Sequence, residues 1–108
     1  MDSRQQRVAR NEALFRQVNE RIEEVNRNVG DDSFSDFLCE CGDDDCTAPV
    51  SLTIAEYEEV RGDPTHFVIA NGHEVPNVER VIETNERFSV VEKFAGEAER
   101  IAVKSDPR

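Results

Sequence analysis

The 108-residue sequence has no tryptophan, a single methionine and no long uninterrupted apolar stretch. A transmembrane helix needs about 20 consecutive apolar residues, so the sequence predicts none. The first ten residues, MDSRQQRVAR, also lack the apolar segment that a signal peptide needs. We therefore expect a cytoplasmic protein with no membrane contact.

Basic residues are scarce as well. Thirteen lysines and arginines stand against 24 aspartates and glutamates, which gives a formal charge of −11. Residues 1–29 carry six arginines and five acidic residues, a balance of +1, so the remaining residues carry −12. An acidic body repels phosphate backbones, and no binding to nucleic acid is expected. Such a surface suits solubility, or contact with a basic protein partner.

Motifs that mark common enzyme classes are missing. The chain has no glycine-rich phosphate loop, no His-Glu-x-x-His pattern and no Ser-His-Asp arrangement. No small-molecule substrate is evident for so short a chain. The sequence therefore does not predict an enzyme.

The length is that of one domain with a modest core. The sequence predicts an α+β fold in three parts. Residues 1–30 form a long amphipathic helix, and residues 31–95 form a zinc-binding α+β domain with a small, mostly antiparallel sheet and one short helix. Residues 96–108 form a flexible C-terminal tail, in which Ala98, Ile101 and Ala102 could support a helical turn or two.

The N-terminal helix is predicted from Gln5 to Val29 because apolar residues recur at alternating spacings of three and four. Asp2 or Ser3 can cap its start, and Gly30 can end it. This apolar seam consists, with one polar interruption, of Val8, Asn11, Phe15, Val18, Ile22, Val25 and Val29. It can pack on the rest of the domain, or pair with the same helix of a second chain as a coiled coil, where a buried Asn11 would set the register.

Several short strands are predicted after this helix. FSDFL and VSLTI flank the cysteines, HFVIA is an apolar run, and the period-two alternation in VERVIE and RFSVVEKF predicts an antiparallel hairpin. Thr53 and Glu56 form a capping box for a brief helix whose apolar face would carry Ile54, Tyr57 and Val60. Asn71-Gly72 predicts a turn.

All three cysteines lie within FSDFLCECGDDDC. In a reducing cytosol an odd number of cysteines favours metal binding over structural disulfides. Cys39 and Cys41 would point to the same side of an extended chain, and Gly42 would let the backbone turn so that Cys46 returns to them. The surrounding acidic residues indicate an exposed turn rather than a core position. Soft thiolate ligands in one turn predict a zinc site.

The fourth ligand must come from elsewhere in the chain. His73, in the Asn-Gly-His-Glu turn after an apolar strand, is preferred to His66, which begins that strand. Carboxylates are less favoured because zinc sites rich in cysteine more often include histidine; the candidates are Glu40, Asp43, Asp44, Asp45 and Glu74.

Four segments, FLCECGDDDC, EYEEVR, FVIANGHEVPNVERV and VVEK, carry a resemblance. Together with the N-terminal NEALFRQVNERIEE they resemble a group of short, uncharacterised, mainly actinobacterial proteins. In that group a Cys-x-Cys-x4-Cys segment precedes a Gly-His-Glu. The resemblance implies that Cys39, Cys41, Cys46 and His73 belong together, and it carries no activity.

These observations predict a small protein with a structural Cys3His zinc site that acts as a protein-interaction or regulatory module. The N-terminal helix would bind a protein partner or form a homodimer. Two alternatives use the same cysteines: a thiol-based redox or metal sensor, and an iron–sulfur protein. An enzymatic site with Glu74 or Glu40 as general base is disfavoured, because three thiolates lower the Lewis acidity of the ion.

Overall fold

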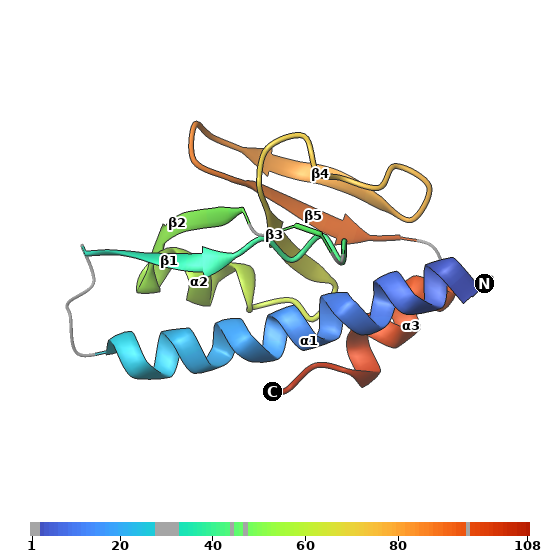
Figure 1. Ribbon diagram of the computed structural model, residues 1–108, viewed down its shortest axis with the longest axis horizontal. Coiled ribbons are helices and arrows are strands. Elements are labelled where there is room, and N and C mark those ends of the chain that lie inside the picture. Colours follow the sequence, from blue (N-terminus) through green and yellow to red (C-terminus); the bar gives the residue numbers. More distant parts are fainter. Residues whose placement is uncertain (1–2, 28–32, 44, 47, 95) are drawn as a thin grey trace.

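The computed structural model describes residues 3–27, 33–43, 45–46, 48–94 and 96–108. Along the chain the elements are α1 (Ser3–Asn26), β1 (Phe34–Leu38), β2 (Pro49–Thr53), α2 (Ile54–Val60), β3 (His66–Ile69), β4 (Glu79–Thr84), β5 (Ser89–Lys93) and α3 (Gly96–Lys104). This arrangement confirms the predicted α+β fold. Helix α1 lies along one long side of the molecule, and the strands lie above it in Figure 1.

The strands form two small antiparallel sheets. β1 pairs with β2, and Phe37 lies opposite Val50 in that pair. The second sheet has the order β3-β5-β4, so the predicted hairpin of β4 and β5 forms and β3 adds to its other side. Backbone bonds from the segment after β1 reach both sheets: the Cys39 N–H donates to the Ala48 carbonyl, and the Glu40 N–H donates to the Val68 carbonyl.

The apolar core lies among the two sheets and α2. The rings of Phe37 and Tyr57 stack with their centroids 4.5 Å apart. The predicted capping box is present, with Thr53 and Glu56 each accepting a hydrogen bond from the other's backbone N–H. The residues that fill the core include Val50, Leu52, Ile54, Tyr57, Val60, Phe67, Val68, Ile69 and Val91.

Helix α1 packs on the body, but the predicted seam is only partly buried, with Ile22 packed against the core. Val18 and Val25 of that seam are exposed, and Val29 lies outside the described residues. The buried stripe is displaced by one residue and is mostly polar: Ala9, Glu12, Arg16, Asn19 and Glu23. None of the helices in the described ranges is long and apolar enough to cross a membrane.

Buried polar partners on the body explain this displacement. Arg16 donates to the carbonyl oxygens of Pro64 at 2.7 Å and Ala102 at 2.6 Å, and its guanidinium lies 4.4 Å from the Phe67 ring centroid. Lys93 of β5 forms ion pairs with Glu12 of α1 and with Glu79. Burying a charged side chain without a partner is costly. The hydrogen bonds of Arg16 and the ion pairs of Lys93 therefore determine which face of α1 packs on the body.

The C-terminal segment also differs from the sequence prediction. Where a flexible tail is expected, the chain forms α3, and Ala102 is only 3 % exposed. Beyond α3, Asp106 pairs with the buried Arg61. Tertiary contacts explain the difference, because Arg16 of α1 donates to the Ala102 carbonyl and fastens α3 to the body.

Candidate metal centre

The three cysteines and His73 come together in the folded chain. Their ligand atoms all lie within 4.8 Å of one another. His73 Nδ1 is 3.5 Å from Cys39 Sγ and 3.5 Å from Cys46 Sγ. In a tetrahedral zinc site, bonds of about 2.3 Å to sulfur and about 2.0–2.1 Å to nitrogen place these atoms about 3.6 Å apart. The observed separations therefore fit ligands of one shared ion.

The cysteine turn depends on its backbone. Gly42 has φ +80°, a left-handed conformation that glycine adopts without a steric penalty. The chain then closes with a hydrogen bond from the Cys46 N–H to the Asp43 carbonyl at 3.1 Å. The Asp43 carboxylate accepts the Asp45 N–H at 2.9 Å, so it stabilises the turn.

His73 is positioned by the predicted turn after β3. Gly72 has φ +88°, and the His73 N–H donates to the Ala70 carbonyl at 3.1 Å. The Ala70 N–H in turn donates to Cys39 Sγ at 3.1 Å. The same short segment thus supplies one ligand and a hydrogen bond to another.

The expectation of an exposed cysteine turn is wrong for two of the three thiols. Cys39 is 2 % exposed and Cys41 is 6 % exposed. The reason is that α1 covers the turn: Asn11 Nδ2 donates to the Gly42 carbonyl at 3.0 Å. A Cβ atom at Gly42 would lie only 2.7 Å from the Val8 carbonyl oxygen, which shows how closely the two segments approach.

Burial controls the acidity of the inner thiols. It raises the pKa of Cys39 far above its usual range, although the Ala70 N–H opposes this shift. Burial likewise raises the pKa of Cys41, against a hydrogen bond from the Asp43 backbone. Both thiols are therefore protonated at neutral pH without a cation, and a bound metal ion would supply the charge that favours the thiolates.

Glu40, between the two inner cysteines and a possible ligand in the sequence, has a different role that the sequence does not predict. Its side chain is fully buried. Its carboxylate accepts hydrogen bonds from Asn19 Nδ2 at 2.8 Å, Tyr57 OH at 3.3 Å and the Val68 N–H at 3.0 Å. The sequence alone could not identify these partners, because they come from three separate elements, α1, α2 and β3.

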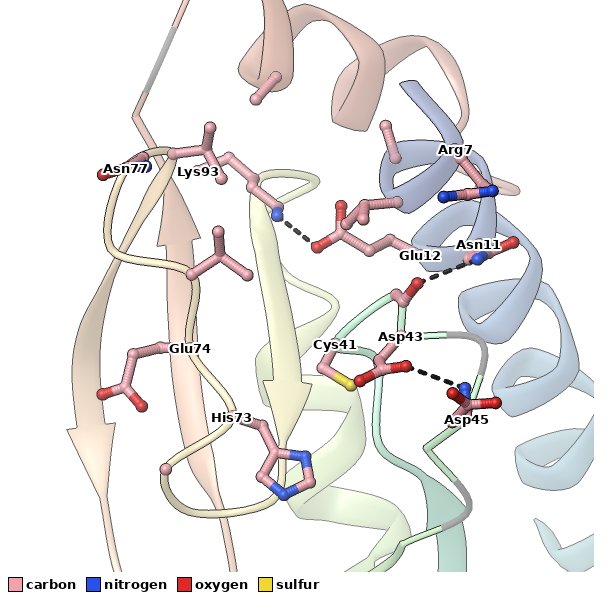
Figure 2. A pocket seen from close by; sticks show the side chains of 17 residues that line it. Arg7, Asn11, Glu12, Cys41, Asp43, Asp45, His73, Glu74, Asn77 and Lys93 are labelled. Atoms are coloured by element: carbon pink, nitrogen blue, oxygen red, sulfur yellow. Dashed lines mark hydrogen bonds and ion pairs between the residues drawn. The ribbon is translucent and has the colours of Figure 1, made fainter. Parts of the chain in front are cut away.

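The other predicted ligands lie elsewhere or do not join the cluster. His66 lies beside Glu92 on a different part of the surface. The Glu74 carboxylate points away from Cys41 in Figure 2, and Asp44 lies outside the described residues.

A cavity of about 890 Å³ adjoins the cluster. Figure 2 shows it between α1, the cysteine turn and the loop after β3, with Cys41 and His73 at one end and the paired Lys93 and Glu12 at the other. Burial raises the pKa of Glu12 from 4.5 to about 7, although Lys93 lowers it. Because Lys93 also pairs with Glu79, two carboxylates share one cation.

Comparisons with known proteins found no counterpart. No protein-family model matches the chain, and neither the curated proteins nor the solved structures gave a match. The resemblance to the short actinobacterial proteins therefore stays a prediction.

Proposed function

We propose that this protein is a zinc-stabilised interaction module. The convergence of Cys39, Cys41, Cys46 and His73 within 4.8 Å carries the metal-binding part of the proposal. Three thiolates and an imidazole are a ligand set that Zn²⁺ favours. Ligands this close suit a single ion better than an iron–sulfur cluster, whose ligands are divided among several iron atoms.

The role of the ion is structural rather than catalytic. Four protein ligands fill a tetrahedral site and leave no position for a reacting water. Burial and raised pKa values of Cys39 and Cys41 also disfavour a redox sensor, because an oxidant reacts with an accessible thiolate. The ion would instead hold the turn between the two sheets beneath α1.

Cobalt substitution tests the metal site. Co²⁺ bound by thiolates gives sulfur-to-metal charge-transfer absorption, which oxygen and nitrogen ligands do not. We expect one such Co²⁺ per wild-type chain, displaced by Zn²⁺, and much weaker binding in Cys41→Ser and His73→Ala. Glu74→Gln, next to His73, is the matched control and should bind as the wild type does. Absence of the charge-transfer band from wild type would contradict the proposal.

The exposed side of α1 supplies the interaction surface. We define the outer face of α1 by Arg10, Leu14, Val18, Arg21 and Val25, which recur at helical spacing opposite the buried stripe. Leu14 is 53 % exposed and Val25 is 73 % exposed. Apolar side chains with arginines complement an acidic, partly apolar protein segment. Two copies of this face would bring like charges together, so an acidic partner is favoured over a homodimer.

Two synthetic peptides test this surface: an amphipathic helix of leucine and glutamate, and the same peptide with lysine in place of glutamate. We expect only the acidic peptide to shift the backbone NMR signals of α1, and Val18→Glu to weaken its binding. Val81→Glu is the matched control, because Val81 is 39 % exposed and Val18 is 37 % exposed. If light scattering shows a dimer that Val18→Glu dissociates, the partner is a second copy and the proposal of an acidic partner is wrong.

A further inference from the structure

A second group of possible metal ligands lies away from the cysteines. Asp63, His66 and Glu92 each offer one ligand atom, and these atoms lie within 4.8 Å of one another. Asp63 precedes β3, His66 begins β3, and Glu92 lies directly opposite His66 in the pairing of β3 with β5. All three side chains are half-buried. The fold therefore brings one imidazole and two carboxylates from three segments to one place.

The distances suit a single ion. His66 Nε2 lies 3.1 Å from Glu92 Oε2 and 3.6 Å from Asp63 Oδ2. With bonds of about 2.0–2.2 Å to nitrogen and oxygen, neighbouring ligands of one ion lie about 3.0–3.5 Å apart. Both carboxylates thus lie near the distance from His66 that two ligands of one ion have, and all three ligand atoms lie within 4.8 Å.

Outer hydrogen bonds hold both carboxylates in position. Asp63 Oδ1 accepts the Thr65 N–H at 2.9 Å and the Thr65 hydroxyl at 2.7 Å, which leaves Oδ2 directed at His66. Glu92 Oε1 accepts from Arg80 Nη2 at 2.6 Å, which leaves Oε2 directed at the same nitrogen. Orientation of ligands by such contacts is typical of metal sites. These bonds lower the pKa of Asp63 and of Glu92, so both carboxylates stay ionised.

The surroundings add negative charge. His66 also lines a cavity of about 170 Å³ whose wall includes Glu56, Glu59 and Glu83. Carboxylates lining a small cavity raise the local concentration of cations. Arg87 pairs with Glu56 and offsets part of this charge.

We propose that Asp63, His66 and Glu92 bind a divalent first-row transition ion such as Mn²⁺ or Zn²⁺. One nitrogen and two oxygens are ligands that such ions accept, and they differ from the soft sulfur ligands of the cysteine site. Three protein ligands leave coordination positions for water. Hydrogen bonding of His66 to the carboxylates without a metal ion is the competing arrangement.

Manganese is the suitable probe, because thiolate sites select softer ions. Mn²⁺ binding to the full chain, with Zn²⁺ already supplied at one equivalent, is measured by electron paramagnetic resonance. We expect one saturable Mn²⁺ per chain, and His66→Gln and Glu92→Gln to weaken it at least about tenfold. Glu86→Gln removes an exposed carboxylate elsewhere and should bind as the wild type does.

A second measurement does not depend on variants. Substoichiometric Mn²⁺ should broaden the ring NMR signals of His66 well before those of His73. Absence of saturable binding, equal weakening by His66→Gln and Glu86→Gln, or unbroadened His66 signals would overturn the proposal. Each of these results would mean that the cluster is an ion pair only.

Discussion

At the residue scale, two glycines show what a left-handed conformation contributes to this site. Gly42 and Gly72 have nearly the same backbone angle, φ +80° and φ +88°. Their surroundings differ. A Cβ at Gly42 would meet the Val8 carbonyl oxygen and Glu12 Cγ at 2.7 Å, whereas nothing lies within 4 Å of a Cβ at Gly72. Alanine at Gly72 therefore adds backbone strain, and alanine at Gly42 adds both strain and a clash with α1.

Paired substitutions separate the two effects. We expect Gly72→Ala to lower the free energy of unfolding by about 1–2 kcal/mol, the cost of left-handed backbone for an L-residue. Gly42→Ala should lower it by about 1–3 kcal/mol more, because α1 must shift. Urea unfolding at matched metal content gives both values. Equal losses in the two variants would mean that α1 does not contact the turn as closely as described.

At the scale of elements, the contact between α1 and the sheets depends on titratable groups. Glu12 has a pKa of about 7 because burial outweighs its attraction to Lys93, whereas in the unfolded chain its value is near 4.5. The folded state therefore binds this proton more tightly than the unfolded state does. Protonated Glu12 therefore contributes its full stabilisation below pH 4.5, its pKa in the unfolded chain. This stabilisation is lost as the pH rises through about 7, its pKa in the folded chain.

Glu12→Gln tests this pH dependence, because an amide does not titrate. The difference in unfolding free energy between wild type and Glu12→Gln should fall by up to about 3 kcal/mol as pH rises from 4.5 to 7. Denaturant titrations across that range measure it. Glu24→Gln, on the exposed side of α1, controls for the loss of one negative charge. A difference that stays constant with pH would show that Glu12 does not take up the proton.

Much of the local structure could be predicted because its causes are local. The Thr53 capping box and the alternation in β4 and β5 identify those elements from neighbouring residues alone. The grouping of the cysteines with His73 could also be predicted, because few residues can complete such a ligand set. The residue types that bind zinc together with cysteine limited the candidates for the fourth ligand, and no knowledge of the fold was needed.

The orientation of α1 could not be predicted in this way. Two stripes of the helix have the same alternating spacing, and hydrophobicity favours the one that includes Val18 and Val25. The polar stripe faces inward because Glu12 meets Lys93 and Asn19 meets Glu40, and only the folded chain brings those partners together. Because α1 packs on the cysteine turn, Cys41 is buried despite its acidic neighbours.

At the scale of the whole molecule, metal binding should depend steeply on pH. Burial raises the pKa of both Cys39 and Cys41, so each must lose a proton when a metal ion binds. The logarithm of the apparent zinc association constant should therefore rise by at least about two per pH unit near neutrality. Competition with a chelator of known affinity at several pH values measures this slope.

Thermal unfolding with and without zinc measures how much the ion stabilises the fold. Removal of zinc should lower the midpoint of thermal unfolding, because the turn beneath α1 loses its cross-link. Glu74→Gln should reproduce the wild-type slope and the wild-type shift. A zinc affinity that does not vary with pH would mean that the buried thiols are not the ligands.

Glu40 and the cysteines beside it belong to one short segment. Cys39 and Cys41 contribute to the cluster of possible metal ligands, and Glu40 between them accepts a hydrogen bond from Asn19 of α1. An ion that orders this segment also orders the surface on which the helix rests. By thermodynamic linkage, the factor by which a bound ion would strengthen helix docking equals the factor by which helix docking would strengthen binding of that ion. A partner that pulls α1 away would therefore weaken metal binding without touching a ligand.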